Sequence, residues 1–99
     1  MTKTDKSDKT TKKPYFIYVL LTENNSLYCG YTDDVQKRFE KHKSGLGAKY
    51  TKSHKPIKIL FQQEFPTKSE ALKAEIKFKK LPRETKLKII DGYLSLNEL

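Results

Sequence analysis

The run from Tyr15 to Leu21 constrains the fold of this chain more than any other segment, because all seven of its residues are aromatic or aliphatic. Residues of these types favour strands, and the run has the length of one strand. Since side chains alternate between the two faces of a strand, both faces here are apolar and both need cover. We therefore expect this strand to lie inside a sheet, with structure packed on each side.

A hairpin is expected directly after this run. Residues 22–26, Thr-Glu-Asn-Asn-Ser, have turn chemistry, and residues 27–31 have the composition of a returning strand. Tyr18 and Tyr28 share a face of this hairpin only if paired residue numbers sum to an even value, which requires an odd-length loop. If the two tyrosines belong to one site, a three- or five-residue loop centred on Asn24 is predicted, whereas a two-residue Asn24-Asn25 turn would place the rings on opposite faces.

A helix is predicted next. Asp33 or Asp34 can cap a helix that runs to about Ser44, and Gly45 can end it. Residues 45–52 have the composition of a basic loop with two glycines. We expect this loop to be flexible and to follow the helix without regular structure.

The third strand is predicted over residues 57–65, after Pro56. Strict alternation would place four apolar side chains on one face of this strand: Ile57, Ile59, Phe61 and Phe65.

Two further helices complete the predicted elements. Thr67 and Glu70 form a capping-box pattern for a helix over residues 67–80, and Pro82 suits the first turn of a helix over residues 82–91, closed by Gly92. The buried stripe of the first of these helices is expected to hold Leu72, Ile76, Ala71 and the stem of Lys79.

The order of these elements is strand, strand, helix, strand, helix, helix. It predicts the α+β class, with a three-stranded, mostly antiparallel sheet flanked by helices on both faces. A chain of 99 residues holds one such domain. We expect residues 1–13 to be a disordered basic tail, residues 14–92 to be the domain, and residues 93–99 to be a C-terminal extension.

Composition excludes several classes of protein. No apolar run approaches the roughly 20 residues of a membrane span, and the polar amino terminus lacks the apolar stretch of a secretory signal. A single cysteine, Cys29, excludes an internal disulfide and a multi-thiolate zinc site, and its mid-strand position favours a small buried side chain over a nucleophile. We expect a soluble protein of the cytoplasm, without a membrane partner and favouring a monomer.

Positive charge is segregated along the chain. The net charge is +9, and residues 37–58 hold eight Lys or Arg against the single acid Glu40. Charge can serve solubility alone, but its clustering favours a nucleic acid partner, DNA first and RNA as an open alternative. The residues expected to contact nucleic acid are Lys37, Lys41, Lys43, Lys49, Tyr50, Thr51, Lys52 and Lys55.

Five polar residues stand within otherwise apolar elements, and these are the candidate site residues: Tyr18, Tyr28, Arg38, His42 and Glu75. A simpler interpretation exists for the two tyrosines and for Glu75. Strand tyrosines are commonly core residues with a hydroxyl that reaches solvent, and Glu75 can pair with Lys79 one helical turn away.

Together these residues resemble the GIY-YIG nuclease domain. Residues 16–18 (Phe-Ile-Tyr) and 28–30 (Tyr-Cys-Gly) match its two tripeptides, and Arg38, His42 and Glu75 follow at matching spacing. The resemblance covers residues 15 to about 91. It is greatest to short stand-alone bacterial members of the family, whose Gly-x-Gly-Ala-x-Tyr-Thr loop matches residues 45–51.

The resemblance implies metal-dependent cleavage of DNA phosphodiester bonds, with repair or recombination as the setting. It implies that Glu75 holds one divalent cation, Mg²⁺ or Mn²⁺, and that Arg38 neutralises the scissile phosphate. It places Tyr18, Tyr28 and His42 around the attacking water, with one of the tyrosines as general base. A hard, oxygen-bound cation and a forked guanidinium are suited to screening a phosphodiester.

The chain departs from the family pattern at a few positions. Phe16 and Cys29 replace scaffold residues of the two tripeptides, and Tyr31 stands where some relatives carry a catalytic lysine. Two alternatives to an enzyme therefore remain. One is a nucleic-acid-binding adaptor that keeps the fold without turnover, and the other is a scaffold that binds a protein partner.

Overall fold

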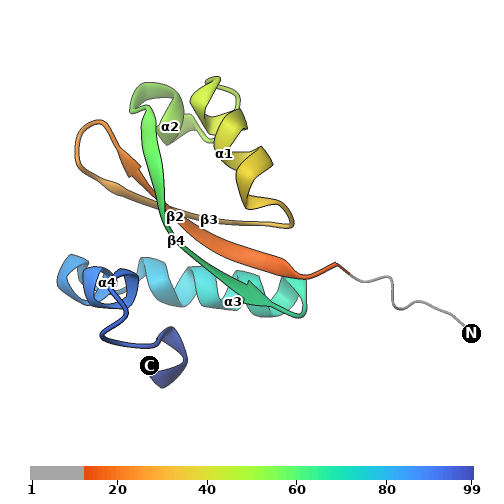
Figure 1. Ribbon diagram of the computed structural model, residues 1–99, viewed down its shortest axis with the longest axis vertical. Helices are drawn as coiled ribbons and strands as arrows, with labels where there is room; N and C mark the ends of the chain where they lie inside the picture. Colours follow the sequence, from red (N-terminus) through yellow and green to blue (C-terminus); the bar gives the residue numbers. More distant parts are fainter. Residues whose placement is uncertain (1–12) are drawn as a thin grey trace, which may run out of the picture.

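The computed structural model describes residues 13–99, so all but the last residue of the tail predicted over residues 1–13 lies outside the described residues (Figure 1). The helices and strands are β2 (Tyr15–Thr22), β3 (Leu27–Thr32), α1 (Val35–Lys43), α2 (Lys49–Ser53), β4 (Pro56–Phe65), α3 (Lys68–Lys79), α4 (Arg83–Ile90) and the 3₁₀ helix η1 (Leu96–Glu98).

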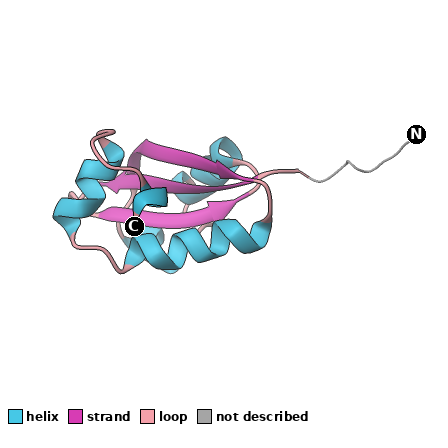
Figure 2. Ribbon diagram, turned by 90° about the horizontal axis from the view of Figure 1, so that it is seen from below, coloured by secondary structure: helices cyan, strands magenta, loops and turns pink. Residues whose placement is uncertain are grey.

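The three strands form an antiparallel sheet in the order β3-β2-β4, so the apolar strand β2 is central, as predicted. Helices α1 and α2 cover one face of the sheet, and α3 and α4 cover the other (Figure 1). Seen from below, α3 runs along the length of the sheet (Figure 2). The predicted α+β class, with three antiparallel strands flanked by helices, is confirmed.

Alternate residues of β2 enter two separate cores. Ile17 and Val19 are fully buried against α3 and α4, in a cluster that includes Phe78. Tyr18 and Leu20 are buried against α1 on the opposite face. This double burial explains why the strand carries no polar face.

The hairpin has the odd-length loop that the sequence predicts. Tyr18 pairs with Gly30 and Leu20 pairs with Tyr28, so paired numbers sum to an even value. The Thr22 amide donates to the Ser26 carbonyl at 3.0 Å, which leaves three loop residues centred on Asn24. The last loop residue, Asn25, has φ 63°, a conformation that closes three-residue hairpin loops. Both tyrosines consequently lie on the α1 face.

The predicted helix caps are also present. The carboxylate of Asp34 accepts the amide of Lys37 at 3.0 Å at the start of α1, and Gly45, with φ 84°, follows its end. At the start of α3 the hydroxyl of Thr67 accepts the amide of Glu70 at 3.1 Å.

The face predicted for β4 is wrong. A register shift lies between the pairs Val19–Phe61 and Leu20–Ile59, so one extra residue of β4 is inserted there as a β-bulge. Phe61 therefore packs on the α3 side while Ile59 packs on the α1 side. Ile57 is 56% exposed.

The apolar stripe predicted for α3 is also wrong in part. The buried residues of this helix are Ala71, Ala74, Glu75 and Phe78, whereas Ile76 is 48% exposed. Small alanines let the helix approach the sheet closely, and the larger Phe78 then fills the core at its far end. Glu75 consequently lies on the buried face of the helix and not at its border.

Two short elements were not predicted. Residues 49–53 of the expected loop form helix α2, and η1 carries Leu96, which is 2% exposed, into the core beneath α3 and α4. Within residues 13–99, no helix has the length and apolar character needed to cross a membrane.

Replacing Phe78 by Ala should lower the free energy of unfolding by about 3–5 kcal/mol, because the fully buried ring leaves a cavity that the sheet cannot fill. Ile76→Ala, two positions away on the same helix but half exposed, should cost less than about 1 kcal/mol. Urea unfolding of both variants measures the difference. Equal losses would show that the face of α3 is assigned wrongly.

Candidate active site

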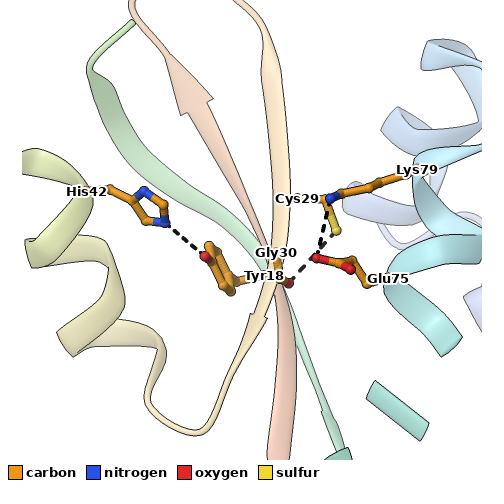
Figure 3. Close-up of polar contacts among 6 residues, drawn as sticks. All are labelled: Tyr18, Cys29, Gly30, His42, Glu75 and Lys79. Carbon is orange, nitrogen blue, oxygen red and sulfur yellow. Dashed lines mark hydrogen bonds and ion pairs between the residues drawn. The ribbon is translucent and has the colours of Figure 1, made fainter. Parts of the chain in front are cut away.

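Three rings from distant parts of the chain meet on the α1 face of the sheet. The Oη atom of Tyr18 lies 2.9 Å from Nε2 of His42, a buried hydrogen bond (Figure 3). The ring of Tyr28 lies 6.4 Å from that of Tyr18 and 5.1 Å from that of His42, measured between centroids. The register of the hairpin brings the tyrosines together, and α1 supplies the histidine.

Gly30 provides the space for Tyr18. A Cβ atom built on Gly30 would lie 2.5 Å from the Tyr18 hydroxyl, closer than real Cβ atoms approach. Because Gly30 pairs directly with Tyr18 across the hairpin, this strand position requires a residue without a side chain. The glycine of the second tripeptide therefore has a packing role in this chain.

The loop after α1 closes over His42 and fixes its orientation. Nδ1 of His42 accepts the backbone amide of Ala48 at 3.3 Å, and it lies 2.6 Å from the hydroxyl of Thr51. The Thr51 hydroxyl also lies 3.0 Å from the Ala48 carbonyl, so its one hydrogen is shared between that oxygen and Nδ1. At Gly47 any Cβ atom would overlap the His42 ring, so the loop can approach this closely only with glycine there.

The Ala48 amide assigns one tautomer to His42. A backbone N–H can only donate, so this contact makes Nδ1 the acceptor and assigns the hydrogen of the neutral ring to Nε2. In this tautomer Nε2–H donates to the Tyr18 oxygen and leaves the proton of Tyr18 free for another partner.

Burial sets the protonation states of this cluster. Desolvation lowers the pKa of His42, and the nearby Arg38 charge acts in the same direction, so the ring is held neutral. Desolvation also raises the pKa of Tyr18, and Tyr28 adds to that rise, whereas Arg38 opposes it. The pKa of Tyr28 is raised as well, mainly by burial. In the free protein all three groups are therefore neutral.

Arg38 lies on α1, one turn before His42, and it is partly exposed. It lines surface depressions next to the end of β3, where Thr32 and Asp33 are its neighbours. This position leaves the guanidinium accessible to a ligand from solvent. Its positive charge also acts to lower the pKa values of Tyr18, Tyr28 and His42.

Glu75 lies apart from the ring cluster. It is on α3, on the opposite face of the sheet, beside Cys29 (Figure 3). Its carboxylate forms an ion pair with Lys79 at 3.4 Å, and its side chain is 12% exposed. The simpler sequence interpretation, pairing with Lys79, is thus confirmed. The structure brings Tyr18, Tyr28, His42 and Arg38 to one face and places Glu75 behind β3.

The two sides still interact electrostatically at β3, which is an edge strand of the sheet. The Glu75 charge raises the pKa values of Tyr18 and Tyr28, while Lys79 lowers that of Tyr28. Burial is the largest cause, and the Glu75 charge the second, of a rise in the pKa of Cys29 to about 12. Its thiol therefore stays protonated and is unsuited to nucleophilic attack.

Glu75 offers the type of donor that Mg²⁺ or Mn²⁺ takes. Within the part of the chain that the structure describes, no cluster of three or more His, Cys, Asp or Glu is placed to hold a metal ion. Mg²⁺ commonly binds one or two carboxylates and completes its shell with water and substrate phosphate. A single carboxylate therefore fits a cation that arrives together with the substrate.

Most residues predicted to contact nucleic acid are exposed. This group comprises Lys37, Lys41, Lys43, Lys49, Lys52 and Lys55, together with Tyr50 at 38% exposure. The prediction that Thr51 contacts nucleic acid is wrong for its side chain. Thr51 is fully buried and its hydroxyl contacts His42, so the side chain is not available to nucleic acid. Sequence reasoning missed the supporting role of residues 47, 48 and 51, because the two glycines indicated only flexibility.

The chain matches the GIY-YIG catalytic domain over residues 14–88. It belongs to the GIY-YIG family, whose domain is that of nucleases. A nuclease domain acts on nucleic acid, which agrees with the exposed lysines around the ring cluster.

Its relatives are short bacterial proteins named UPF0213. A UPF0213 protein of Bacillus velezensis is 48% identical over 78% of this chain and 78% of its own length, and one of Staphylococcus saprophyticus is 47% identical over 77% and 93%. Two solution structures are also similar. One is the UPF0213 protein BH0048 of Bacillus halodurans (38% identity, TM-score 0.52, covering 79% and 83% of the two chains). The other is the E. faecalis protein EF2693 (42% identity, TM-score 0.57, covering 83% and 88%). These names state no activity.

The lowered pKa of His42 predicts a pH dependence of stability. Histidine in the unfolded chain has a pKa of about 6.5. Below this pH the unfolded chain therefore binds a proton at His42 that the folded chain does not bind. The free energy of unfolding should therefore fall as pH drops from 6.5 to 5, by at most about 1.4 kcal/mol per pH unit from this residue. Urea unfolding of wild type and His42→Gln measures it, and equal slopes in both proteins would contradict the assignment.

Proposed function

We propose that this protein is a divalent-metal-dependent DNA nuclease that hydrolyses phosphodiester bonds, with repair or recombination as its setting. The observation that carries the proposal is the hydrogen bond of Tyr18 to a neutral, fixed His42, with Tyr28 and Arg38 beside it. Tyr18 and His42 are buried polar side chains, and the half-buried Tyr28 links them to the surface.

The substrate phosphate is proposed to lie across the edge of the sheet at β3. Strand β3 is an edge strand, so a strand of DNA can lie along it with the ring cluster on one side and Glu75 on the other. Arg38 is positioned to pair with a phosphate oxygen, and the exposed lysines of α1 and α2 hold the flanking backbone. Bound at Glu75, a divalent cation supplies positive charge that screens the phosphate.

Tyr18 is the proposed general base. As a phenolate its oxygen takes a proton from the attacking water while the new P–O bond forms and the bond to the leaving oxygen breaks. Nε2–H of His42 already donates to this oxygen and stabilises the phenolate without moving. Because burial raises the pKa of Tyr18 in the free protein, ionisation depends on positive charge, of which Arg38 is one source. The cleavage rate should therefore rise with pH above neutrality.

A second candidate function is a nucleic-acid-binding adaptor without turnover. The ion pair of Glu75 with Lys79 and the position of Glu75 behind the sheet favour it, because a carboxylate that is already neutralised is a poorer ligand for a cation. An adaptor would bind DNA in a salt-sensitive manner with no metal-dependent product.

Replacing Glu75 by Gln or Arg38 by Gln should reduce cleavage by about 10²–10³-fold, because the first change removes the charge proposed to hold the cation and the second removes the charge proposed to pair with the phosphate. Glu84→Gln and Arg83→Gln, exposed on α4, are the matched controls and should cleave as wild type does. The assay uses nicked, branched and single-stranded DNA with Mg²⁺, Mn²⁺ or a chelator.

The outcomes of this assay separate the two candidate functions. Metal-dependent cleavage that is lost in the Glu75 and Arg38 variants supports the nuclease. Undiminished cleavage by the Glu75 variant refutes its role, and DNA binding by wild type without product under any metal condition supports the adaptor.

The role of Thr51 can be tested by two substitutions. Thr51→Val keeps the shape but removes the hydroxyl from Nδ1 of His42, so we expect a loss of about 1–3 kcal/mol in stability and a lower cleavage rate with a shifted pH profile. Thr51→Ser keeps the hydroxyl and should restore the wild-type profile. The nitrogen chemical shift of Nδ1 in the His42 ring reports its hydrogen bonding directly, and an unchanged Nδ1 shift and pH profile in Thr51→Val would argue against this role.

A further inference from the structure

Two aromatic rings, one on helix α2 and one on the residue that follows it, extend the ring cluster to the surface. The ring of Tyr50 in α2 is nearly parallel to that of Tyr28, with an interplanar angle of 9° and centroids 6.4 Å apart. His54, directly after α2, lies 4.7 Å from Tyr50, again between centroids. A row of Tyr28, Tyr50 and His54 therefore leads from the candidate active site out to solvent.

The outer rings of this row are not core residues. Tyr50 is 38% exposed, and His54 is partly exposed. A surface depression is lined by Lys49, Tyr50, Ser53 and His54, so the rings border a recess open to solvent. Part of each ring is therefore open to a ligand from solvent.

The Tyr50 ring is also held in place. Its Oη atom accepts the side-chain amide of Asn24 at 3.1 Å, from the hairpin loop that sets the register of β2 and β3. A ring that is oriented before a ligand arrives loses little conformational entropy on binding. The loop that brings Tyr18 and Tyr28 to one face thus orients Tyr50 as well.

We propose that Tyr50 and His54 stack with an unpaired nucleobase next to the scissile phosphate, so that the substrate class is single-stranded DNA or a single-stranded segment of a branched molecule. This proposal rests on the proposed nuclease function, because it names the substrate of that activity. The binding itself does not require cleavage.

The chemistry of the surface favours an unpaired base over a duplex. In a duplex the faces of the bases are covered by their neighbours, and only their edges are open to a protein. In single strands the faces are free to stack on aromatic side chains, whatever the base. The exposed Lys49, Lys52 and Lys55 around the rings supply the positive charge that tracks the backbone of such a strand.

Binding measured in the presence of a chelator tests this proposal. Fluorescence anisotropy compares a labelled oligo(dT) with a DNA duplex of equal length at one salt concentration. Tyr50→Ala and His54→Ala should each weaken binding of oligo(dT) by about tenfold. Binding of the duplex should change less than about twofold, because lysines dominate it.

Two further variants serve as controls. Tyr50→Phe keeps the ring and should bind oligo(dT) as wild type does, apart from the small effect of the lost contact with Asn24. Tyr93→Ala removes a tyrosine that is 83% exposed beyond α4, remote from the row, and should change neither affinity.

A second measurement uses wild-type protein alone, so it does not depend on the folding of any variant. A single-stranded oligonucleotide with one 2-aminopurine should lose fluorescence when its base stacks on the row. An oligo(rU) of the same length should bind no more tightly than oligo(dT).

Equal weakening of single-stranded and duplex binding in Tyr50→Ala and His54→Ala would overturn the proposal, as would no weakening of either. Tighter binding of oligo(rU) would overturn DNA as the ligand. Selective single-strand binding without any metal-dependent cleavage would leave this inference standing and refute the nuclease.

Discussion

The pairing of β2 with β3 is the constraint on which the rest of the molecule depends. Strand β2 divides its side chains between two cores, Ile17 and Val19 on one side and Tyr18 and Leu20 on the other. A slip of one residue would exchange the two sets, moving the tyrosine into the α3 core and Val19 toward α1. The three-residue loop around Asn24 prevents that slip, so the turn that ends the first strand also determines the face on which the candidate site is built.

Local signals in the sequence were sufficient for most of the fold. The double-sided strand and the caps at Asp34 and Thr67 each follow from residues that are close together in the chain, whereas the odd loop was predicted from the requirement that two tyrosines of one site share a face. The failures occur where tertiary packing decides. The bulge between Ile59 and Phe61 has no signature in the alternation of apolar residues, and α3 turns its small alanines to the sheet because close approach there outweighs the burial of larger side chains such as Ile76.

The candidate site shows the same division. Spacing along the sequence placed Arg38 and His42 on one helix face, and the candidate site required an odd loop that puts the two tyrosines on one strand face. It gave no information about which side of the sheet α3 covers, so the separation of Glu75 from the rings could not be foreseen. Thr51 was assigned to the surface because its neighbours are basic and polar. Its burial follows from the contact between two loop residues and a histidine nine positions earlier, which only the folded loop reveals.

Gly30 and Gly47 limit the amino-acid substitutions that this chain can accept. Neither residue takes a positive φ, so both provide clearance for a neighbouring ring and not backbone freedom. A side chain at position 47 becomes tolerable only if the imidazole at position 42 gives way to something smaller in the same step. Substitutions within residues 42–51 are thereby coupled. A chimaera of this chain with a relative should therefore exchange all of residues 42–51 or none of them.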